Sequence, residues 1–191
     1  MIDCGGTSLP VCSLQSIRMM LAIAAELDYK VFMLGVQTAF MNAEVEKDVF
    51  AKMAPGYDMA DKSGVSLVMK LKKNLYGFRQ SPKHWFNIEF RPLRAESEFG
   101  PLKSDPCIYV LEDDTGFVIL TLYVDGVLLL GGNEQLLSKL KKQLMGRFEM
   151  TDMGVSRVLG MNATRDRKKA TITIDQKHYT EDVVERFGMK D

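Results

Sequence analysis

The sequence predicts an α+β fold, a mostly antiparallel sheet with helices on one face. Three observations lead to this prediction. Apolar residues recur at helical spacing in a few separate stretches, other stretches are alternating or continuously apolar as strands are, and turn signals join consecutive strands directly. Because runs of strands are separated by single helices, the order is typical of sheets of the split βαβ type.

The first half of the chain contains a capped helix followed by short strands. Residues 1–12, which include two glycines and a proline, are predicted to be an irregular lead-in. Ser13 can cap a helix that extends to about Leu27, because an apolar face follows it at helical spacing. Further predicted elements are strands over 31–34, 48–53 and 65–71, and a helix from about Pro82 to about Glu96 that Pro92 should kink.

The second half begins with strands and ends with a helix. Strands are predicted over 107–111 and 117–123, with a turn between them, and a further hairpin follows in 121–132. Asn133 can cap a helix whose apolar stripe is Leu136, Leu137, Leu140, Leu144 and Phe148. Residues 158–165 and 170–174 are predicted to pair across a basic turn, and a last helix ends at Gly188.

The composition is that of an ordinary globular domain. The chain has 191 residues, enough for one domain with a sizeable core, and its 25 basic and 25 acidic side chains cancel. Three distant cysteines and two histidines give no disulfide framework and no zinc site. The sequence shows neither a signal peptide nor a membrane-spanning run, so an intracellular protein without a membrane partner is expected.

The stretch TLYVDGVLLLGG places one carboxylate, Asp125, between two apolar strands, followed by Gly126. Asp-Gly is good turn chemistry, so an ordinary turn is one interpretation. The alternative is a metal site. Carboxylates at a hairpin tip, facing another on a neighbouring strand, can hold two Mg²⁺ ions about 3.5–4 Å apart for nucleotidyl transfer.

Blocks of sequence from about Pro10 to Lys190 resemble the reverse transcriptase (RNA-directed DNA polymerase) of copia-type LTR retrotransposons. The blocks occur in the family's order and include SIRMMLAIAAE, GVQTAFMNAEVEKDVFAKMAPGY, VMKLKKNLYGFRQSPKHWF, SDPCIYV, LYVDG, RFEMTDMG, LGMNATRDR and HYTEDVVERFGM. The resemblance implies one reverse transcriptase domain fragment over 13–191: a ferredoxin-like palm, partial fingers, and a thumb that begins near residue 176. The remaining fingers, thumb and RNase H of such a transposable-element polyprotein are expected to be missing.

The same resemblance implies a damaged catalytic site. Of the family's three catalytic aspartates, Asp125 is matched, whereas Gly35 and Gly126 stand where the other two belong. Asp125 is therefore the predicted catalytic residue and metal ligand. The family uses Mg²⁺, and productive Mg²⁺ binding is not expected here, because glycine supplies no side-chain ligand.

Further candidate sites also come from the resemblance. The predicted nucleotide-binding residues are Ala39, Phe40, Tyr76, Gly77 and Gln80, with Phe40 as the steric gate against the sugar 2′ hydroxyl. Predicted nucleic-acid contacts are Lys70, Lys72, Lys73, Arg79 and Lys83, and the primer-gripping turn Leu159, Gly160 and Met161. Each has a structural alternative. Phe40 can be core, the loop with Tyr76 and Gly77 can be an ordinary turn, the basic residues can be a solvated face, and residues 159–161 can be a buried apolar strand. The basic residues Arg165, Arg167, Lys168 and Lys169 are predicted to form a solubilising turn.

Three functional hypotheses follow. The first is a polymerase, whose partners would be an RNA or DNA template-primer and deoxynucleotides, in the cytoplasm, within a virus-like particle, or in the nucleus. The second is a nucleic-acid-binding remnant that has lost catalysis. The third is a structural relic without activity. The loss of two carboxylates alongside intact apolar periodicity favours a catalytically degenerate domain.

Overall fold

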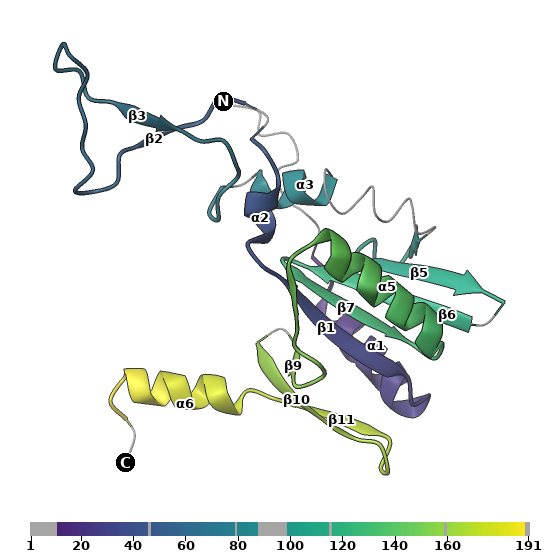
Figure 1. The fold of residues 1–191 in the computed structure, drawn as a ribbon. Coiled ribbons are helices and arrows are strands. Elements are labelled where there is room, and N and C mark those ends of the chain that lie inside the picture. Colours follow the sequence, from purple (N-terminus) through teal and green to yellow (C-terminus); the bar gives the residue numbers. More distant parts are fainter. Residues whose placement is uncertain are drawn as a thin grey trace. The chain divides into compact units, whose positions relative to one another are not determined.

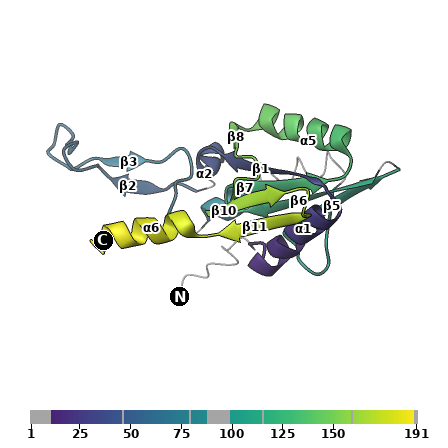
Figure 2. The ribbon, with the colours of Figure 1, turned by 90° about the horizontal axis from the view of Figure 1, so that it is seen from below.

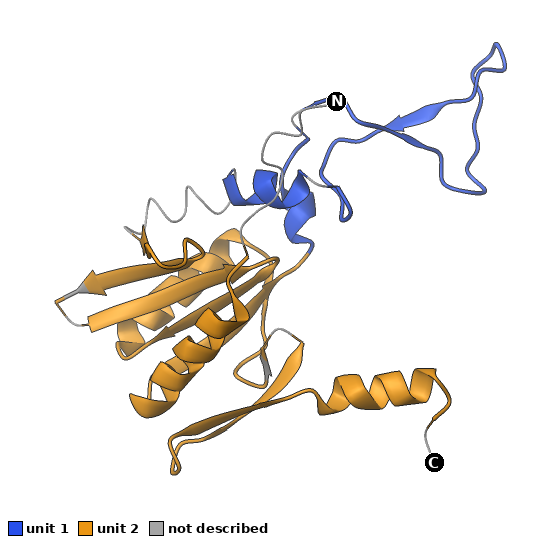
Figure 3. Cartoon of the chain, turned by 180° about the vertical axis from the view of Figure 1, so that it is seen from behind, with its two compact units in different colours: residues 1–9, 38–96 blue, residues 10–37, 97–191 orange. Residues whose placement is uncertain are grey.

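The computed structural model describes residues 11–45, 47–78, 80–87, 99–114, 116–158 and 160–189. Figure 3 shows that the chain divides into two compact units. The first consists of Met1–Leu9 and Thr38–Glu96, and the second of Pro10–Gln37 and Ser97–Asp191. The predicted lead-in lies outside the described residues except for its last two positions.

The largest part of the second unit is a six-stranded antiparallel sheet (Figure 1). Its spatial order is β4 (Gly100–Pro101), β5 (Ile108–Asp113), β6 (Gly116–Tyr123), β7 (Gly126–Gly131), β1 (Lys30–Val36) and β8 (Met150–Asp152). All five pairings are antiparallel. The predicted antiparallel sheet and its hairpin are therefore confirmed. Strand β1 precedes the other strands of this sheet in the sequence but lies between β7 and β8 and pairs with both. This pairing places residue 35 of β1 opposite residue 126 of β7.

Helices cover both faces of this sheet, so the prediction of helices on one face is wrong. Figure 2 shows α5 (Glu134–Arg147) on one side and α1 (Leu14–Glu26) on the other. Val31 and Met33 share a core with α1, whereas the ring of the intervening Phe32 lies 4.1 Å from the Lys141 ammonium of α5. The central strand β7 explains why both faces are covered: its sequence is GVLLLG, and all six residues are buried. Continuous burial requires cover on both faces.

Both helix starts are capped as predicted. The Ser13 hydroxyl accepts the backbone N–H of Ser16 at 3.0 Å, and α1 begins at Leu14. The Asn133 side chain accepts the backbone N–H groups of Gln135 and Leu136, each at 3.0 Å. The predicted leucine stripe of α5 is buried at Leu137, Leu140 and Leu144.

The C-terminal part contains a hairpin and a projecting helix. Strand β10 (Met161–Asp166) pairs with β11 (Thr171–Asp175) across the basic turn, as predicted. The prediction of a single strand over 158–165 is wrong. The structure has two strands there, because β9 (Arg157–Val158) pairs antiparallel with β10 and Val158 lies opposite Met161. Helix α6 (Lys177–Arg186) confirms the last predicted helix and has no buried residue.

The first unit is small and its strands are exposed. It contains α2 (Ala39–Asn42), α3 (Ser81–Trp85) and the ribbon of β2 (Phe50–Lys52) with β3 (Val68–Lys70). Both strands are shorter than predicted. The predicted helix near Pro82 begins at Ser81, and most of its remainder, including Pro92, lies outside the described residues.

None of the helices in the described ranges combines the length and apolar character needed to cross a membrane.

Candidate active site

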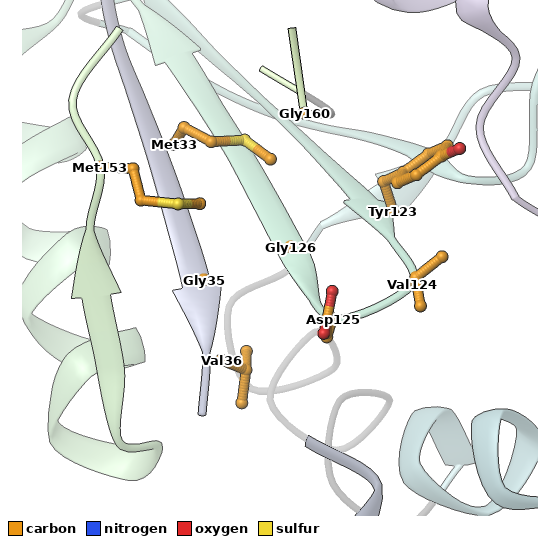
Figure 4. Close-up of a pocket in the computed structure, with 9 residues that line it drawn as sticks. All are labelled: Met33, Gly35, Val36, Tyr123, Val124, Asp125, Gly126, Met153 and Gly160. Atoms are coloured by element: carbon orange, nitrogen blue, oxygen red, sulfur yellow. The ribbon is translucent and has the colours of Figure 1, made fainter. Parts of the chain in front are cut away.

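A cavity of about 430 Å³ opens beside the turn between β6 and β7 (Figure 4). Its walls come from three parts of the second unit: the ends of β1 and β7, the β6–β7 turn, and the segments around residues 153 and 160. The lining residues are Met33, Gly35, Val36, Tyr123, Val124, Asp125, Gly126, Met153 and Gly160. Among these residues Asp125 is the only acidic one, so the cavity wall is mostly apolar.

The tip of the hairpin is a two-residue turn made by Val124 and Asp125. Tyr123 pairs with Gly126, so Gly126 is the first residue of β7 and not part of the turn. The prediction that Asp125 and Gly126 form the turn is therefore wrong by one residue. Val124 has a φ of 56°, a conformation costly for a β-branched residue, whereas the φ of Asp125 is not positive. A positive φ at the first central position alone is the type II′ pattern.

Gly35 and Gly126 are direct pairing partners in the β1–β7 ladder. Side chains alternate along a strand, so position 35 faces the same side as Met33, and position 126 the same side as Leu128. Met33 and Leu128 both belong to the core shared with α1. The backbone N–H of Val36 also donates to the Asp125 carbonyl at 2.8 Å. Side chains at 35 and 126 would therefore lie next to each other, beside Asp125.

Two methionines lie against the space that those side chains would need. A Cβ atom at position 35 would lie 3.2 Å from Cε of Met153. A Cβ atom at position 126 would lie 2.9 Å from Cε of Met33. Figure 4 shows the side chains of Met33 and Met153 near the two glycines, on the face of the sheet that lines the cavity. Both contacts are to the far ends of flexible side chains, which can move at small cost.

The residues present do not fit a pair of Mg²⁺ ions. Mg²⁺ requires near-octahedral oxygen coordination and is usually held by one or two carboxylates together with substrate phosphates. A two-ion site needs more negative charge than Asp125 supplies alone, and thioether sulfur is a poor ligand for a hard cation. Within the described ranges no three His, Cys, Asp or Glu side chains are grouped so that they could hold a metal ion.

The predicted nucleotide-binding residues lie in the first unit. Phe40 is 5% exposed and Ala39 is fully buried, which is what the core alternative for Phe40 requires. The ring centroid of Phe40 lies 4.7 Å from that of the half-exposed Tyr76. Gly77 has a φ of 94°, which glycine adopts readily, and Gln80 is half-buried. The gating role of Phe40 stays a prediction.

Asn74, which sequence reasoning missed, holds the loop that carries Tyr76 and Gly77. Its side chain is fully buried and donates to the carbonyls of Ala43 at 3.2 Å and Glu44 at 2.9 Å. Those carbonyls follow directly after α2, so Asn74 ties the loop to the helix that carries Phe40. No local pattern reveals this, because the partners are 30 and 31 residues apart in sequence.

The residues predicted to contact nucleic acid differ in how exposed their side chains are and in whether they already have a partner. Lys72 and Lys73 are exposed, Lys83 is half-buried, and Lys70 forms an ion pair with Asp48 at 2.7 Å. Gly160 lines the cavity with a φ of 77°, and the half-buried Met161 begins β10. Arg79 and Leu159 lie outside the described residues.

Comparison with known proteins gives consistent matches. A family model described as reverse transcriptase (RNA-dependent DNA polymerase) matches residues 2–191. The chain is 37% identical over 183 residues to the retrovirus-related Pol polyprotein from transposon TNT 1-94 of Nicotiana tabacum, covering 95% of the chain and 14% of that relative. It is 30% identical over 189 residues to the corresponding polyprotein from transposon RE1 of Arabidopsis thaliana, covering 98% and 13%.

A yeast relative, the transposon Ty1-NL2 Gag-Pol polyprotein of Saccharomyces cerevisiae, is 25% identical over 127 residues, which cover 64% of the chain and 7% of that relative. The chain thus spans about one seventh of the length of the two plant polyproteins. No solved structure matches it.

Proposed function

We propose a function from the premise that this chain belongs to the reverse transcriptase (RNA-dependent DNA polymerase) family, in the branch found in copia-type Pol polyproteins. The proposal is that it is the reverse transcriptase domain of such a polyprotein, and that this copy does not catalyse nucleotidyl transfer. One observation carries the second half: Gly35 pairs with Gly126 beside Asp125, so that one carboxylate remains where the two-metal reaction needs three.

In this proposal the six-stranded sheet is the palm, the β2–β3 ribbon is part of the fingers, and the chain from near residue 176 begins the thumb. The palm would meet an RNA or DNA template-primer, and the loop around Tyr76 and Gly77 would meet a deoxynucleotide. A place in the cytoplasm, inside a virus-like particle, or in the nucleus belongs to the same proposal. These roles are supported by family membership and by the position of the cavity at the tip of β6 and β7.

The missing carboxylates remove the electrostatic part of the reaction. Two divalent ions carry four positive charges, and Asp125 offsets one of them. Without its ions the site can neither lower the pKa of an attacking hydroxyl nor stabilise a leaving phosphate. Loss of a partner that only supports a metal ligand already costs roughly 10–100-fold in affinity or activity, so loss of two ligands should cost far more.

The first prediction is that the chain incorporates no nucleotide. In primer extension with Mg²⁺ or Mn²⁺ we expect no template-dependent product above a control without protein, because the ions have no site. The measurement is gel-resolved extension of a labelled primer on RNA and on DNA templates. Product that depends on both template and protein would refute the proposed inactivity.

A second candidate function is nucleic-acid binding without catalysis. The observation that favours it is the exposure of two consecutive lysines, Lys72 and Lys73, two residues after the end of β3. Binding that uses phosphate contacts should weaken with salt, with a log–log slope of about −0.7 to −0.9 per contact. A solvated lysine face would show no such dependence.

The second prediction concerns these lysines. We expect Lys72→Gln with Lys73→Gln to weaken binding to an RNA–DNA hybrid and to reduce the salt slope by about 0.7 to 0.9 for each lost contact. Filter binding at several salt concentrations measures both quantities. Lys62→Gln, at an exposed position in the same unit, is the control and should change neither. Complete absence of salt-dependent binding by the unaltered chain would leave the structural relic as the remaining hypothesis.

A further inference from the structure

Arg165 is the one basic residue of the β10–β11 hairpin whose side chain is nearly buried, at 11% exposed. Its guanidinium donates to the backbone carbonyls of Tyr29 at 2.5 Å and Ala24 at 3.0 Å. It also forms an ion pair with Asp28 at 2.9 Å. We call this set of contacts the Arg165 clamp. The prediction that Arg165 belongs to a solubilising turn is therefore wrong.

The clamp fastens the hairpin to the end of α1. This helix ends at Glu26, and carbonyl groups in its last turn have no partner within the helix and carry partial negative charge. A planar guanidinium can serve several acceptors in fixed directions, which a lysine ammonium cannot match. The partners are 136 to 141 residues away in sequence, so the contact joins two distant parts of the unit.

The clamped strand leads directly to the cavity. Arg165 lies on β10, which begins at Met161, immediately after the cavity-lining Gly160. Five pairs with β11 make β10 a stiff connection between these two points. The hairpin also contacts the unit through the exposed Arg167, which pairs with the same Asp28 at 3.3 Å, and through apolar packing at the buried Ala163. Apolar contacts are not directional, so they permit small shifts that hydrogen bonds to fixed carbonyls prevent.

We propose that Arg165 is a positioning residue: the clamp on the end of α1 sets where Gly160 and the start of β10 lie against the cavity, and thereby where they hold a primer end. The inference rests on the proposed nucleic-acid binding. It assigns Arg165 no contact with nucleic acid, because its guanidinium is occupied inside the unit. Lys168 is exposed on the turn of the same hairpin and is the natural comparison.

The experiment compares Arg165→Gln and Arg165→Lys with Lys168→Gln as the control. Each protein is titrated with an RNA–DNA hybrid that carries 2-aminopurine at the primer 3′ terminus, at several salt concentrations. We expect both Arg165 variants to bind about tenfold more weakly and to lose the fluorescence change at the primer end. Their salt slope should stay that of the unaltered chain, because no phosphate contact is removed. Lys168→Gln should keep the fluorescence change.

The outcomes separate the two proposals. If the unaltered chain does not bind the hybrid, the nucleic-acid-binding proposal and this inference both fail. If it binds, and a folded Arg165→Gln protein binds equally well with the same primer-end signal, this inference alone fails. A salt slope that falls by about one contact in Arg165→Gln would also overturn it, since that would indicate direct phosphate contact.

A second variant covers the case in which Arg165→Gln does not fold. Asp28→Asn removes the ion pairs with Arg165 and Arg167 and leaves both carbonyl acceptors of Arg165 in place. We therefore expect a loss of affinity of about two- to fivefold with the salt slope unchanged. Hydrogen exchange of the backbone amides between 160 and 163 gives a readout without nucleic acid. Exchange should be faster in both variants, and unchanged exchange together with unchanged affinity would contradict the clamp's role.

Discussion

A chain that carries both Gly35→Asp and Gly126→Asp is expected to bind Mn²⁺ at least about a hundredfold more tightly than either single variant. Positions 35 and 126 are pairing partners on one face of the sheet, where directly opposite Cβ atoms lie about 4.5–5.5 Å apart. Two new carboxylates there would meet that of Asp125. Because all three act on the same ions, the gain of the pair should greatly exceed the sum of the single gains.

The surroundings permit both substitutions. Met153 and Met33 must each move the end of a flexible side chain by a few tenths of an ångström or more. The glycines themselves do not have a positive φ, so an aspartate meets no backbone strain at either position. We expect the double variant to fold, with a modest loss of stability from the displaced methionines and from repulsion between carboxylates when no metal is present.

The charge-matched control is Gly100→Asp with Gly146→Asp. Both of these glycines lie in the same unit, and a Cβ atom at either would have nothing within 4 Å beyond its chain neighbours and, for Gly146, the backbone of its own helix. This control adds the same two charges without adding ligands, so Mn²⁺ affinity measured by electron paramagnetic resonance should not change. Equal affinities of the double variant and this control would contradict the assignment of positions 35 and 126 as lost ligand positions.

Asp105→Asn is expected to lower the free energy of unfolding by about 2 kcal/mol at pH 7, because it removes charge-assisted hydrogen bonds. The Asp105 carboxylate joins the start of α1 to the start of β5. It accepts the Ser16 hydroxyl at 2.7 Å, the Ser13 backbone N–H at 3.3 Å and the Cys107 backbone N–H at 3.1 Å. The Cys12 thiol is a further, weaker donor at 3.6 Å.

The effect should depend on pH. Burial by itself would raise the pKa of Asp105, but the hydrogen bonds from Ser16, Cys107 and Ser13 outweigh it and lower the pKa. A carboxylate whose folded pKa is lowered contributes stability that is present above its unfolded pKa of about 3.9 and is lost as the pH falls through the folded value. The difference between the two proteins should therefore be full at pH 7 and shrink below about pH 4.

Urea unfolding at pH 7 and pH 3 measures this difference. Asp182→Asn is the control, because Asp182 is exposed on α6, and it should change stability little at either pH. A difference between the unaltered chain and Asp105→Asn that stays the same at both pH values would show that the charge of Asp105 is not what stabilises the junction.

Local features of the fold could be predicted because their causes are local. The caps at Ser13 and Asn133, the leucine stripe of α5 and the strand pairs around 121–132 each depend on residues within a few positions of one another. Two predictions needed correction. The strands β2 and β3 are shorter than predicted, because only three residues of each pair with the other. Helices also lie on both faces of the six-stranded sheet and not on one. The continuous burial of β7 was visible in the sequence as VLLL, which an exposed sheet face would have interrupted with polar residues.

The sequence by itself determined that positions 35 and 126 supply no carboxylate, because glycine has no side chain whatever the fold. It also determined the family, since the matching blocks extend along nearly the whole chain. Only the tertiary structure decided that those two positions face each other, that methionines border the space, and that Asn74, Asp105 and Arg165 join distant segments. Such contacts depend on how strands pair and helices pack across separations of 30 to 141 residues, and no short pattern in a chain encodes the direction in which a side chain finally points.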